Sequence, residues 1–222
     1  MNSQNNNKRL LIAFDMDGTL IDGRLVFAVA EKFGLSDKVR EIQENRKLHG
    51  YEQSIIIARL FKGLSATDII RGIESINLMK NCERVLQELK EQGHVLGIIS
   101  DSYDIAANYV AENLNLDFCE ANTLELDTNK KLTGSINMPL GWQKIRCYCK
   151  ISVCKRYHLE KNAQKFHISP GATVAIGDTK SDLCMIENAG IGVAFMPKDK
   201  ILETRAAVSI KDPDLANFLE LI

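Results

Sequence analysis

The sequence has almost no net charge and no long hydrophobic run. Its 222 residues carry 28 Lys+Arg against 29 Asp+Glu, a formal net charge of −1 at pH 7. This balance gives no global electrostatic reason to expect binding to nucleic acid or to an anionic membrane. The apolar stretch after the polar Met1–Arg9 covers only Leu10–Phe14, far too short for a signal-peptide core or a membrane span. We therefore expect a soluble cytoplasmic protein with no nucleic-acid or membrane partner.

The cysteines lack the spacing of common metal and redox sites. They form no CxxC pair and lie mostly inside apolar runs, as reduced core thiols do. Cys147, Cys149 and Cys154 are close in sequence, but their spacing matches no common zinc pattern and no histidine pair accompanies them. We expect all six to be core or surface thiols: Cys82, Cys119, Cys147, Cys149, Cys154 and Cys184.

What the sequence does contain is typical of a globular chain. Hydrophobic residues make up 45% and charged residues 26%, which excludes general disorder. The length exceeds one average domain and falls short of two. One domain that carries a sizeable insertion fits this length as well as two compact units do.

The hydrophobic pattern begins with a short buried strand, Leu10–Phe14, that ends in a turn at Asp-Met-Asp-Gly. A stretch without strong strand signals follows, from about 24 to 79. Ser65 and Asp68 resemble a helix capping box within it. The helical patches of this stretch are Leu25–Phe33, Asp37–Leu48, Gln53–Phe61 and Ala66–Ile76.

From Cys82 onward, helices and strands alternate, which predicts an α/β fold with a parallel sheet covered on both faces. In such sheets ligands bind outside the carboxyl ends of the strands. A helical insertion that leaves from the end of the first strand would therefore hang over the site as a cap. The elements predicted here are helices at Cys82–Glu91, Ile105–Asn113, Trp142–Tyr157, Ser181–Asn188 and Asp214–Leu221; strands at Val95–Ile99, Thr173–Ile176 and Ile191–Ala194; and a hairpin of Thr123–Leu126 with Leu132–Ile136.

Two acids, Asp15 and Asp17, follow the first strand at a spacing of two, so both carboxylates point to the same side of an extended chain. Gly18 then permits a tight turn. Two carboxylates this close raise the pKa of at least one of them unless a cation lies between them. The pair therefore suits either a hard cation such as Mg²⁺ or acid–base chemistry.

Further polar residues accompany this pair. Ser100 ends the strand Val95–Ile99, and Asp178 and Asp182 follow the strand Thr173–Ile176. Lys150 lies within the predicted helix after the hairpin. A parallel sheet would bring these residues to one edge, where four acids, a hydroxyl and a cation suit a phosphoryl group and its metal.

These residues resemble, in order, the motifs of the haloacid dehalogenase (HAD) superfamily: Asp15-Met-Asp-Gly-Thr19, Ser100, Lys150 and Gly-Asp178-x-x-x-Asp182. The helical insertion resembles the small cap of the phosphoserine-phosphatase-like branch (subfamily IB). The resemblance implies a Rossmann-like, three-layer core with an inserted all-helical cap. We expect the core to cover residues 1–22 and 80–222 and the cap residues 23–79.

The resemblance implies Mg²⁺-dependent hydrolysis of a small phosphorylated metabolite in two steps. Asp15 would be the nucleophile that forms an aspartyl-phosphate, and Asp17 the acid and then the base. Ser100 and Lys150 would hold the phosphoryl oxygens, and Mg²⁺ would be bound by Asp15, Asp17 and Asp178 with support from Asp182. Lys144 and Lys155 are the alternatives for the lysine.

The substrate-binding positions depart from those of phosphoserine phosphatases. Arg24 stands where those enzymes place a glutamate for the substrate ammonium, and their cap arginine falls near Ala58, beside Arg59. Arg24 would favour an anionic group over an ammonium. Asp101 also departs from the pattern of phosphoserine phosphatases. The motif around it, Ser100-Asp101-Ser102, resembles the corresponding motif of phosphoserine:homoserine phosphotransferases.

Three functions follow as hypotheses. The first is a phosphatase with Ser100, Asp101, Lys150, Arg24 and Arg59 as substrate contacts, whose substrate need not be phosphoserine. The second is a phosphotransferase that passes the phosphoryl group to an acceptor alcohol. The third is a non-enzymatic module that binds a phosphorylated ligand.

Overall fold

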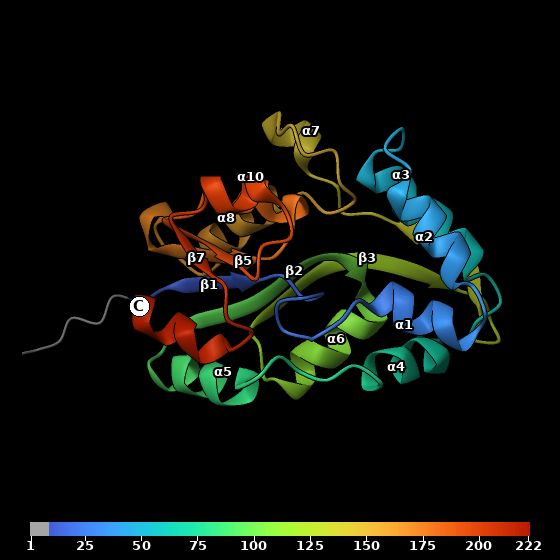
Figure 1. The fold of residues 1–222 in the computed structure, drawn as a ribbon, viewed down its shortest axis with the longest axis horizontal. Helices are drawn as coiled ribbons and strands as arrows, with labels where there is room; N and C mark the ends of the chain where they lie inside the picture. Colours follow the sequence, from blue (N-terminus) through green and yellow to red (C-terminus); the bar gives the residue numbers. More distant parts are fainter. Residues whose placement is uncertain (1–8) are drawn as a thin grey trace, which may run out of the picture.

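The computed structural model describes residues 9–222, and the polar run at the N-terminus lies mostly outside them. Within these residues the centre is a seven-stranded sheet in the order β4-β3-β2-β1-β5-β6-β7 (Figure 1). All neighbouring strands are parallel except β3 and β4, which form the predicted antiparallel hairpin. The strands are β1 Leu11–Phe14, β2 Val95–Tyr103, β3 Phe118–Leu126, β4 Leu132–Asn137, β5 Thr173–Gly177, β6 Ile191–Phe195 and β7 Val208–Ile210.

Strand β1 lies at the centre of the sheet and is buried along its whole length, as its continuous apolar sequence predicts. Phe14 is in register with Ile98 of β2 and with Ile176 of β5. The chain therefore leaves β1 and β5 at the same edge, whereas β2 runs on to Tyr103 and carries Ser100 past that level. This register places the first-strand acids between the end of β5 and the last part of β2.

Helices cover both faces of the sheet and bury separate hydrophobic clusters (Figure 1). On one face lie α5 Cys82–Glu91, α6 Asp104–Asn113 and the 3₁₀ segment η3 Leu215–Leu221. On the other face lie α8 Lys155–Lys165, α9 Leu183–Ile186 and α10 Lys200–Arg205, with the short 3₁₀ turns η1 Pro170–Ala172 and η2 Lys180–Asp182. The predicted fold class, an α/β core of three layers, is confirmed.

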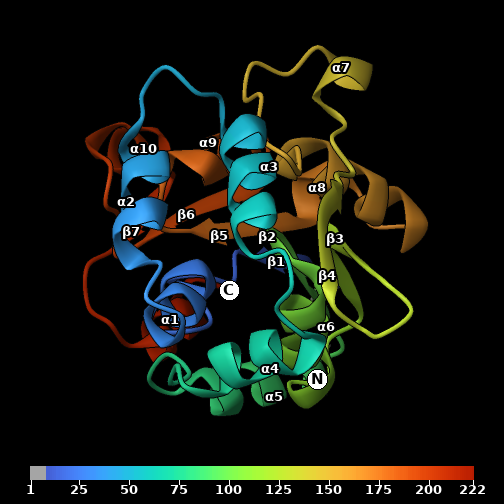
Figure 2. The ribbon, with the colours of Figure 1, turned by 90° about the vertical axis from the view of Figure 1, so that its right-hand side faces the viewer.

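The segment between β1 and β2 is helical, as predicted. Figure 2 shows the molecule with helices α1 to α4 of this segment toward the viewer. Its first four helices are α1 Leu25–Lys32, α2 Ser36–Glu44, α3 Gly50–Leu60 and α4 Ala66–Glu74. The Ser65–Asp68 capping box at the start of α4 is confirmed, because the Asp68 N–H donates to the Ser65 Oγ and the Ser65 N–H to the Asp68 carboxylate.

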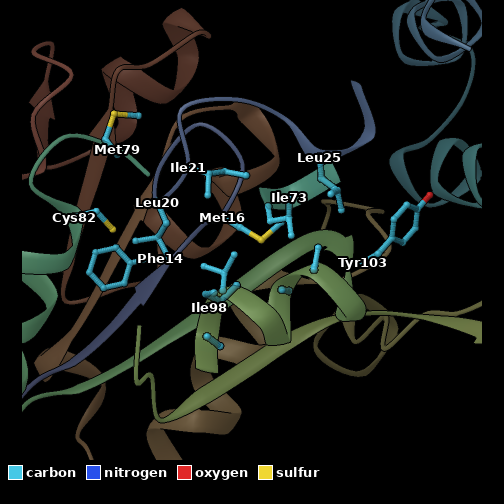
Figure 3. Close-up of a cluster of buried hydrophobic side chains, with 14 of the residues drawn as sticks. Phe14, Met16, Leu20, Ile21, Leu25, Ile73, Met79, Cys82, Ile98 and Tyr103 are labelled. Atoms are coloured by element: carbon cyan, nitrogen blue, oxygen red, sulfur yellow. The ribbon is translucent and has the colours of Figure 1, made fainter. Parts of the chain in front are cut away.

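These inserted helices pack on the core through one continuous hydrophobic cluster. Figure 3 shows Leu25 of α1 and Ile73 of α4 beside Met16, with Phe14 and Ile98 of the sheet close by. The segment after α3 also hydrogen-bonds to the hairpin, since the N–H of Leu132 donates to the carbonyl of Leu64 at 2.7 Å. The division into a core of 1–22 and 80–222 and a cap of 23–79 stays a prediction.

One helix prediction is wrong. Within 142–157 the chain is helical only over α7 Trp142–Ile145 and from the start of α8 at Lys155. Between them it is irregular, and Arg146 and Lys150 adopt left-handed backbone conformations. The β-branched Ile151 and Val153 just before α8 disfavour helix and are the sequence signal for this break.

No helix within residues 9–222 is both long enough and apolar enough to cross a membrane.

Candidate active site

The carboxyl ends of three neighbouring strands carry the polar residues that the sequence singled out. Asp15 directly follows β1, and its N–H donates to the carbonyl of Ile176 in β5 at 2.9 Å. Asp178 directly follows β5. Ser100 lies in β2, two residues beyond the partner of Phe14, and is fully buried. The sheet register thus gathers these residues at one edge, as predicted.

A buried lysine joins two of the acids. The Nζ atom of Lys155 lies 2.7 Å from Oδ1 of Asp15 and 2.5 Å from Oδ1 of Asp182. The Lys155 and Asp182 side chains are completely buried and that of Asp15 is 5% exposed. Burial of three charged groups is tolerated only when they compensate one another, so this cluster is held together by its own charges.

The lysine at this place is Lys155, and the assignment to Lys150 is wrong on geometry. Lys150 is exposed, and its carbonyl accepts a hydrogen bond from the N–H of Tyr51. The error follows from the helix prediction over 142–157, which put Lys150 in mid-helix. In the structure the helix begins at Lys155, whose side chain is thereby placed at the strand ends. Lys144, the other alternative, is exposed and contacts Tyr157.

Two glycines allow the acids to approach the backbone. A Cβ on Gly18, at φ +84°, would lie 2.2 Å from Oδ2 of Asp178, and one on Gly177 would lie 2.2 Å from Cγ of Asp182. Oδ2 of Asp182 also accepts hydrogen bonds from the N–H groups of Asp178 and Thr179, at 3.1 and 3.0 Å. Both oxygens of Asp182 are therefore occupied by protein donors.

The charges in this cluster shift one another's protonation. Burial and the neighbouring Asp182 raise the pKa of Asp15 well above its usual range, although Lys155 opposes the shift. Burial alone would lower the pKa of Lys155, but the carboxylates of Asp15 and Asp182 outweigh it and raise that pKa. Lys155 is thus a fixed cation beside Asp15 at neutral pH.

Asp178 faces the same cluster from the other side. Burial and the charge of Asp182 raise its pKa to about 6, against the opposing effect of Lys198. Nζ of Lys198 lies 2.5 Å from Oδ2 of Asp178 and is half exposed, whereas Oδ1 of Asp178 is buried and has no hydrogen-bond partner within residues 9–222.

These carboxylates fit a divalent cation. One oxygen each of Asp15, Asp178 and Asp182 lies within 4.8 Å of the others, and all three residues are buried. The Oδ1 atom of Asp178 has no partner within residues 9–222, and the pKa values of Asp15 and Asp178 are raised. Both features are expected of neighbouring acids whose negative charge is not neutralised. Carboxylate oxygens at this density are the donors that Mg²⁺ prefers.

Asp17 lies at the junction with the inserted helices. Its Oδ1 accepts a hydrogen bond of 2.6 Å from the N–H of Leu25, the first residue of α1. Burial raises the pKa of Asp17, while the Leu25 N–H and the nearby Arg24 lower it. A carboxyl whose pKa is raised can carry a proton closer to neutral pH, as a general acid requires.

The predicted substrate contacts are not all brought to the cluster. Arg24 is exposed and donates to Oε1 of Gln43 at 2.9 Å, although its charge reaches Asp17. Asp101, half-buried, adds its charge to those acting on Asp15 and Asp17. Arg59 is exposed on α3, and its backbone lies beside Gly134 of β4.

Sequence reasoning missed two polar residues of this region. Lys198 follows β6, another strand whose carboxyl end reaches this edge. The position of Lys198 after the apolar run of this strand was the sequence signal that could have marked it as a site residue. Asn122 is buried in β3; its Nδ2 donates to the carbonyl of Asp101 at 2.7 Å and to Oγ of Ser152 at 2.8 Å. No sequence pattern marks Asn122.

Comparison with known proteins defines the class of this site. Residues 12–187 match the family model of the haloacid dehalogenase-like hydrolases, so the chain belongs to that family. It is a phosphomonoester hydrolase of this family, as the motifs predicted, and its relatives are of the phosphoserine-phosphatase-like branch.

The similar proteins share nearly the whole chain. A phosphoserine phosphatase of Methanocaldococcus jannaschii is 32% identical, over 97% of this chain and 98% of its own. One of Archaeoglobus fulgidus is 31% identical over 98% of this chain and 61% of its own. A substrate-bound phosphoserine phosphatase structure superimposes with a TM-score of 0.84 at 31% identity and covers 97% of this chain and 99% of its own.

Proposed function

We propose that this protein is a Mg²⁺-dependent phosphatase that hydrolyses a small phosphomonoester through an aspartyl-phosphate. The observation that carries the proposal is the contact of Asp15 with Lys155 at the ends of the central strands. A carboxylate nucleophile needs an anionic phosphoryl group brought close to it, and a fixed ammonium offsets the charge of both. Family membership and relatives named phosphoserine phosphatase support the same chemistry.

In the first step a carboxylate oxygen of Asp15 attacks phosphorus, and the bond from phosphorus to the alcohol oxygen breaks. Asp17 gives its proton to that oxygen, so the product leaves as a neutral alcohol. The Leu25 N–H holds Asp17 in position, and the raised pKa of Asp17 keeps a proton available for this transfer. Ser100 and Lys155 would hold the phosphoryl oxygens.

In the second step water attacks the aspartyl-phosphate. Asp17, now a carboxylate, takes a proton from the water, and the bond between phosphorus and the Asp15 oxygen breaks. Inorganic phosphate leaves, and Asp15 is again a carboxylate and Asp17 a carboxylic acid. Positioning and charge supply most of the acceleration in phosphoryl transfer.

Mg²⁺ would be held by the side chains of Asp15 and Asp178 and by the main-chain carbonyl of Asp17. When bound, Mg²⁺ supplies positive charge that neutralises phosphoryl oxygens. Asp182 positions Lys155 instead of binding the ion directly, because both of its oxygens already accept hydrogen bonds from protein donors.

We further propose that the preferred substrate carries an anionic group where phosphoserine carries its ammonium. Arg24, at the start of α1, stands where the related enzymes place a glutamate, and its charge acts on Asp17. A guanidinium repels an ammonium and pairs with a carboxylate or phosphate.

The test is a panel of phosphomonoesters with Mg²⁺, phosphoserine included, run on the wild type and on Asp15→Asn. We expect phosphate release by the wild type and its collapse in Asp15→Asn with the circular dichroism spectrum unchanged. Activity that survives in Asp15→Asn would overturn the mechanism. A preference of several orders of magnitude for phosphoserine would overturn the substrate proposal alone.

The same assay distinguishes the two other hypotheses. An added acceptor alcohol diverts the phosphoryl group from water if the protein is a phosphotransferase, and the yield of free phosphate then falls as a phosphorylated alcohol appears. A non-enzymatic module would bind the esters without releasing phosphate in either variant.

A further inference from the structure

A second cluster of possible metal ligands lies outside the proposed active site. The irregular segment between α7 and α8 carries Cys147, Cys149 and Cys154, and α9 supplies Cys184 from the other side. In Figure 1 the α7 region extends away from the sheet. The sequence spacing of the first three matched no zinc pattern because the fourth cysteine comes from a distant part of the chain.

The four sulfur atoms form a compact group. All lie within 4.8 Å of one another. A Zn²⁺ ion with four thiolate ligands has Zn–S distances of about 2.3 Å, which puts the sulfurs of a tetrahedron about 3.8 Å apart. The sulfur atoms therefore need to approach one another by about 1 Å at most to reach the spacing of a tetrahedral site.

The cluster is closed to solvent, as structural metal sites are. Cys154 and Cys184 are 0% and 1% exposed, Cys147 is 7% exposed, and Cys149 is half-buried. Partly buried Trp142, Ile145 and Tyr157 pack around them. This group is separate from the two hydrophobic clusters that line the faces of the sheet. Its buried members are three of the four cysteines, Cys147, Cys154 and Cys184.

The segment that carries three of these cysteines is irregular, although its end is anchored by buried Ser152 and Val153. Between α7 and α8 it forms no regular helix or strand, and Arg146 and Lys150 occupy left-handed conformations that non-glycine residues rarely adopt. A backbone bent in this way persists only when its surroundings fix it. Four metal–sulfur bonds would fix it at both ends.

Positive potential from the start of α8 and from a neighbouring arginine reaches the sulfur atoms, which a metal binds as thiolates. Cys154 is the N-cap of α8, where the helix dipole stabilises negative charge. The cation of Arg156 lies close enough to interact with Cys147 and Cys154.

We propose that Cys147, Cys149, Cys154 and Cys184 bind one Zn²⁺ ion in a closed structural site. Four soft sulfur ligands in a tetrahedral arrangement select zinc over Mg²⁺, which prefers oxygen. Each coordinating thiol loses its proton to solvent as the ion binds. With all four positions filled by protein, the ion has no place for substrate and acts on the fold.

The site ties together the two segments that hold the buried charge cluster. Cys154 directly precedes Lys155, and Cys184 follows Asp182 by two residues. A metal that joins these cysteines fixes the start of α8 against α9 and with it the 2.5 Å contact of Lys155 with Asp182.

The test measures metal in the full-length protein, purified in reducing buffer without chelator and analysed by elemental mass spectrometry. We expect one zinc per chain, and its loss in Cys147→Ser and in Cys184→Ser. The matched control is Cys119→Ser, a half-buried cysteine on β3 outside the cluster, which keeps the metal. Replacement of zinc by Co²⁺ produces thiolate-to-cobalt charge-transfer absorption and the visible bands of a tetrahedral ion.

Several results would overturn the proposal. They are reduced protein that contains no zinc and gains none on addition, a disulfide between two of the four cysteines, or iron in place of zinc. Zinc that survives in both serine variants but is lost in Asp178→Asn would place the ion at the carboxylates. If the serine variants do not fold, the cobalt spectrum of the wild type decides, because oxygen-bound Co²⁺ gives no thiolate charge transfer.

Discussion

Nζ of Lys155 lies 2.7 Å from Oδ1 of Asp15, in a place where both side chains are buried. The two residues are far apart in the sequence and meet because β1 and the start of α8 reach the same edge of the sheet. The contact gives the nucleophile of the proposed reaction a permanent counter-charge. It also distinguishes Lys155 from the lysines that the sequence offered beside it.

Replacement of Lys155 by methionine should abolish most of the activity. Loss of one charged group that stabilises a phosphoryl transition state lowers kcat by about 100-fold or more. The buried carboxylates of Asp15 and Asp182 also lose their partner, which lowers the free energy of unfolding at neutral pH by up to about 3 kcal/mol. Phosphate release and urea unfolding measure the two effects.

The control for this variant is Lys150→Met, at an exposed position. We expect its kcat and its unfolding curve to stay close to those of the wild type. A loss of activity in Lys150→Met equal to that in Lys155→Met would contradict the placement of the lysine.

Mg²⁺ should stabilise the protein more at about pH 7.5 than at about pH 5. The pKa of Asp178 is raised to about 6 by burial and by Asp182, so without a cation the folded state holds a proton that the unfolded state releases near pH 4. Stability from this group therefore falls as pH rises through about 4 to 6. Above about pH 6 a bound cation takes the place of the proton on Asp178, and below that pH the cation and the proton compete for the carboxylate.

Thermal melts with and without Mg²⁺ at the two pH values measure this effect. In Asp178→Asn we expect the Mg²⁺-dependent rise in Tm to disappear and the metal-free protein to gain stability at the higher pH. An equal Mg²⁺ effect at both pH values would argue against binding at this carboxylate.

Gly18→Ala should disrupt the site although it adds one methyl group. The residue has φ +84°, which costs an alanine about 1–2 kcal/mol, and its Cβ would lie 2.2 Å from Oδ2 of Asp178. We expect a lower Tm and weaker Mg²⁺ binding in a calorimetric titration. Gly171→Ala is the matched control, because its Cβ meets no atom of residues 9–222 within 4 Å; equal effects in both variants would refute the steric argument.

Glu120→Gln should destabilise the protein more at neutral pH than in acid. Glu120 of β3 contacts α8 through His158 and Lys161, at 2.9 and 3.1 Å. Although burial opposes the shift, His158 and Asn162 hold the pKa of Glu120 at about 2, below its ordinary 4.5. Stability from this carboxylate is therefore present above about pH 4.5 and is lost as pH falls toward 2.

Urea unfolding at about pH 7 and about pH 3 measures this difference. Since Glu120 is partly exposed, we expect a deficit of about 1–2 kcal/mol at the higher pH that shrinks at the lower. Glu160→Gln, in an exposed pair with Arg156, should stay within about 0.5 kcal/mol of the wild type. A loss of unfolding free energy in Glu120→Gln that does not change with pH would show that side-chain packing, and not the charge of Glu120, is responsible.

The sequence by itself determined the fold class and most of the strand-end residues. The apolar run that ends before Asp15 predicts a buried strand, and the polar residues directly after Ile99 and Gly177 mark the carboxyl edge of the sheet, although β2 itself runs on to Tyr103. These are local patterns of hydrophobicity and turn residues, so they can be read without the rest of the chain. Helix Cys82–Glu91 was predicted to the residue for the same reason.

Only the tertiary structure decided which lysine reaches Asp15, which acid is left unpartnered and which cysteines meet. The choice between Lys150 and Lys155 depends on where α8 begins relative to the sheet, and the β-branched residues before Lys155 indicate only that a helix is interrupted there. Cys184 joins Cys147 only because α9 packs beside the segment that precedes α8. Such contacts join distant parts of the chain, and local pattern carries no information about them.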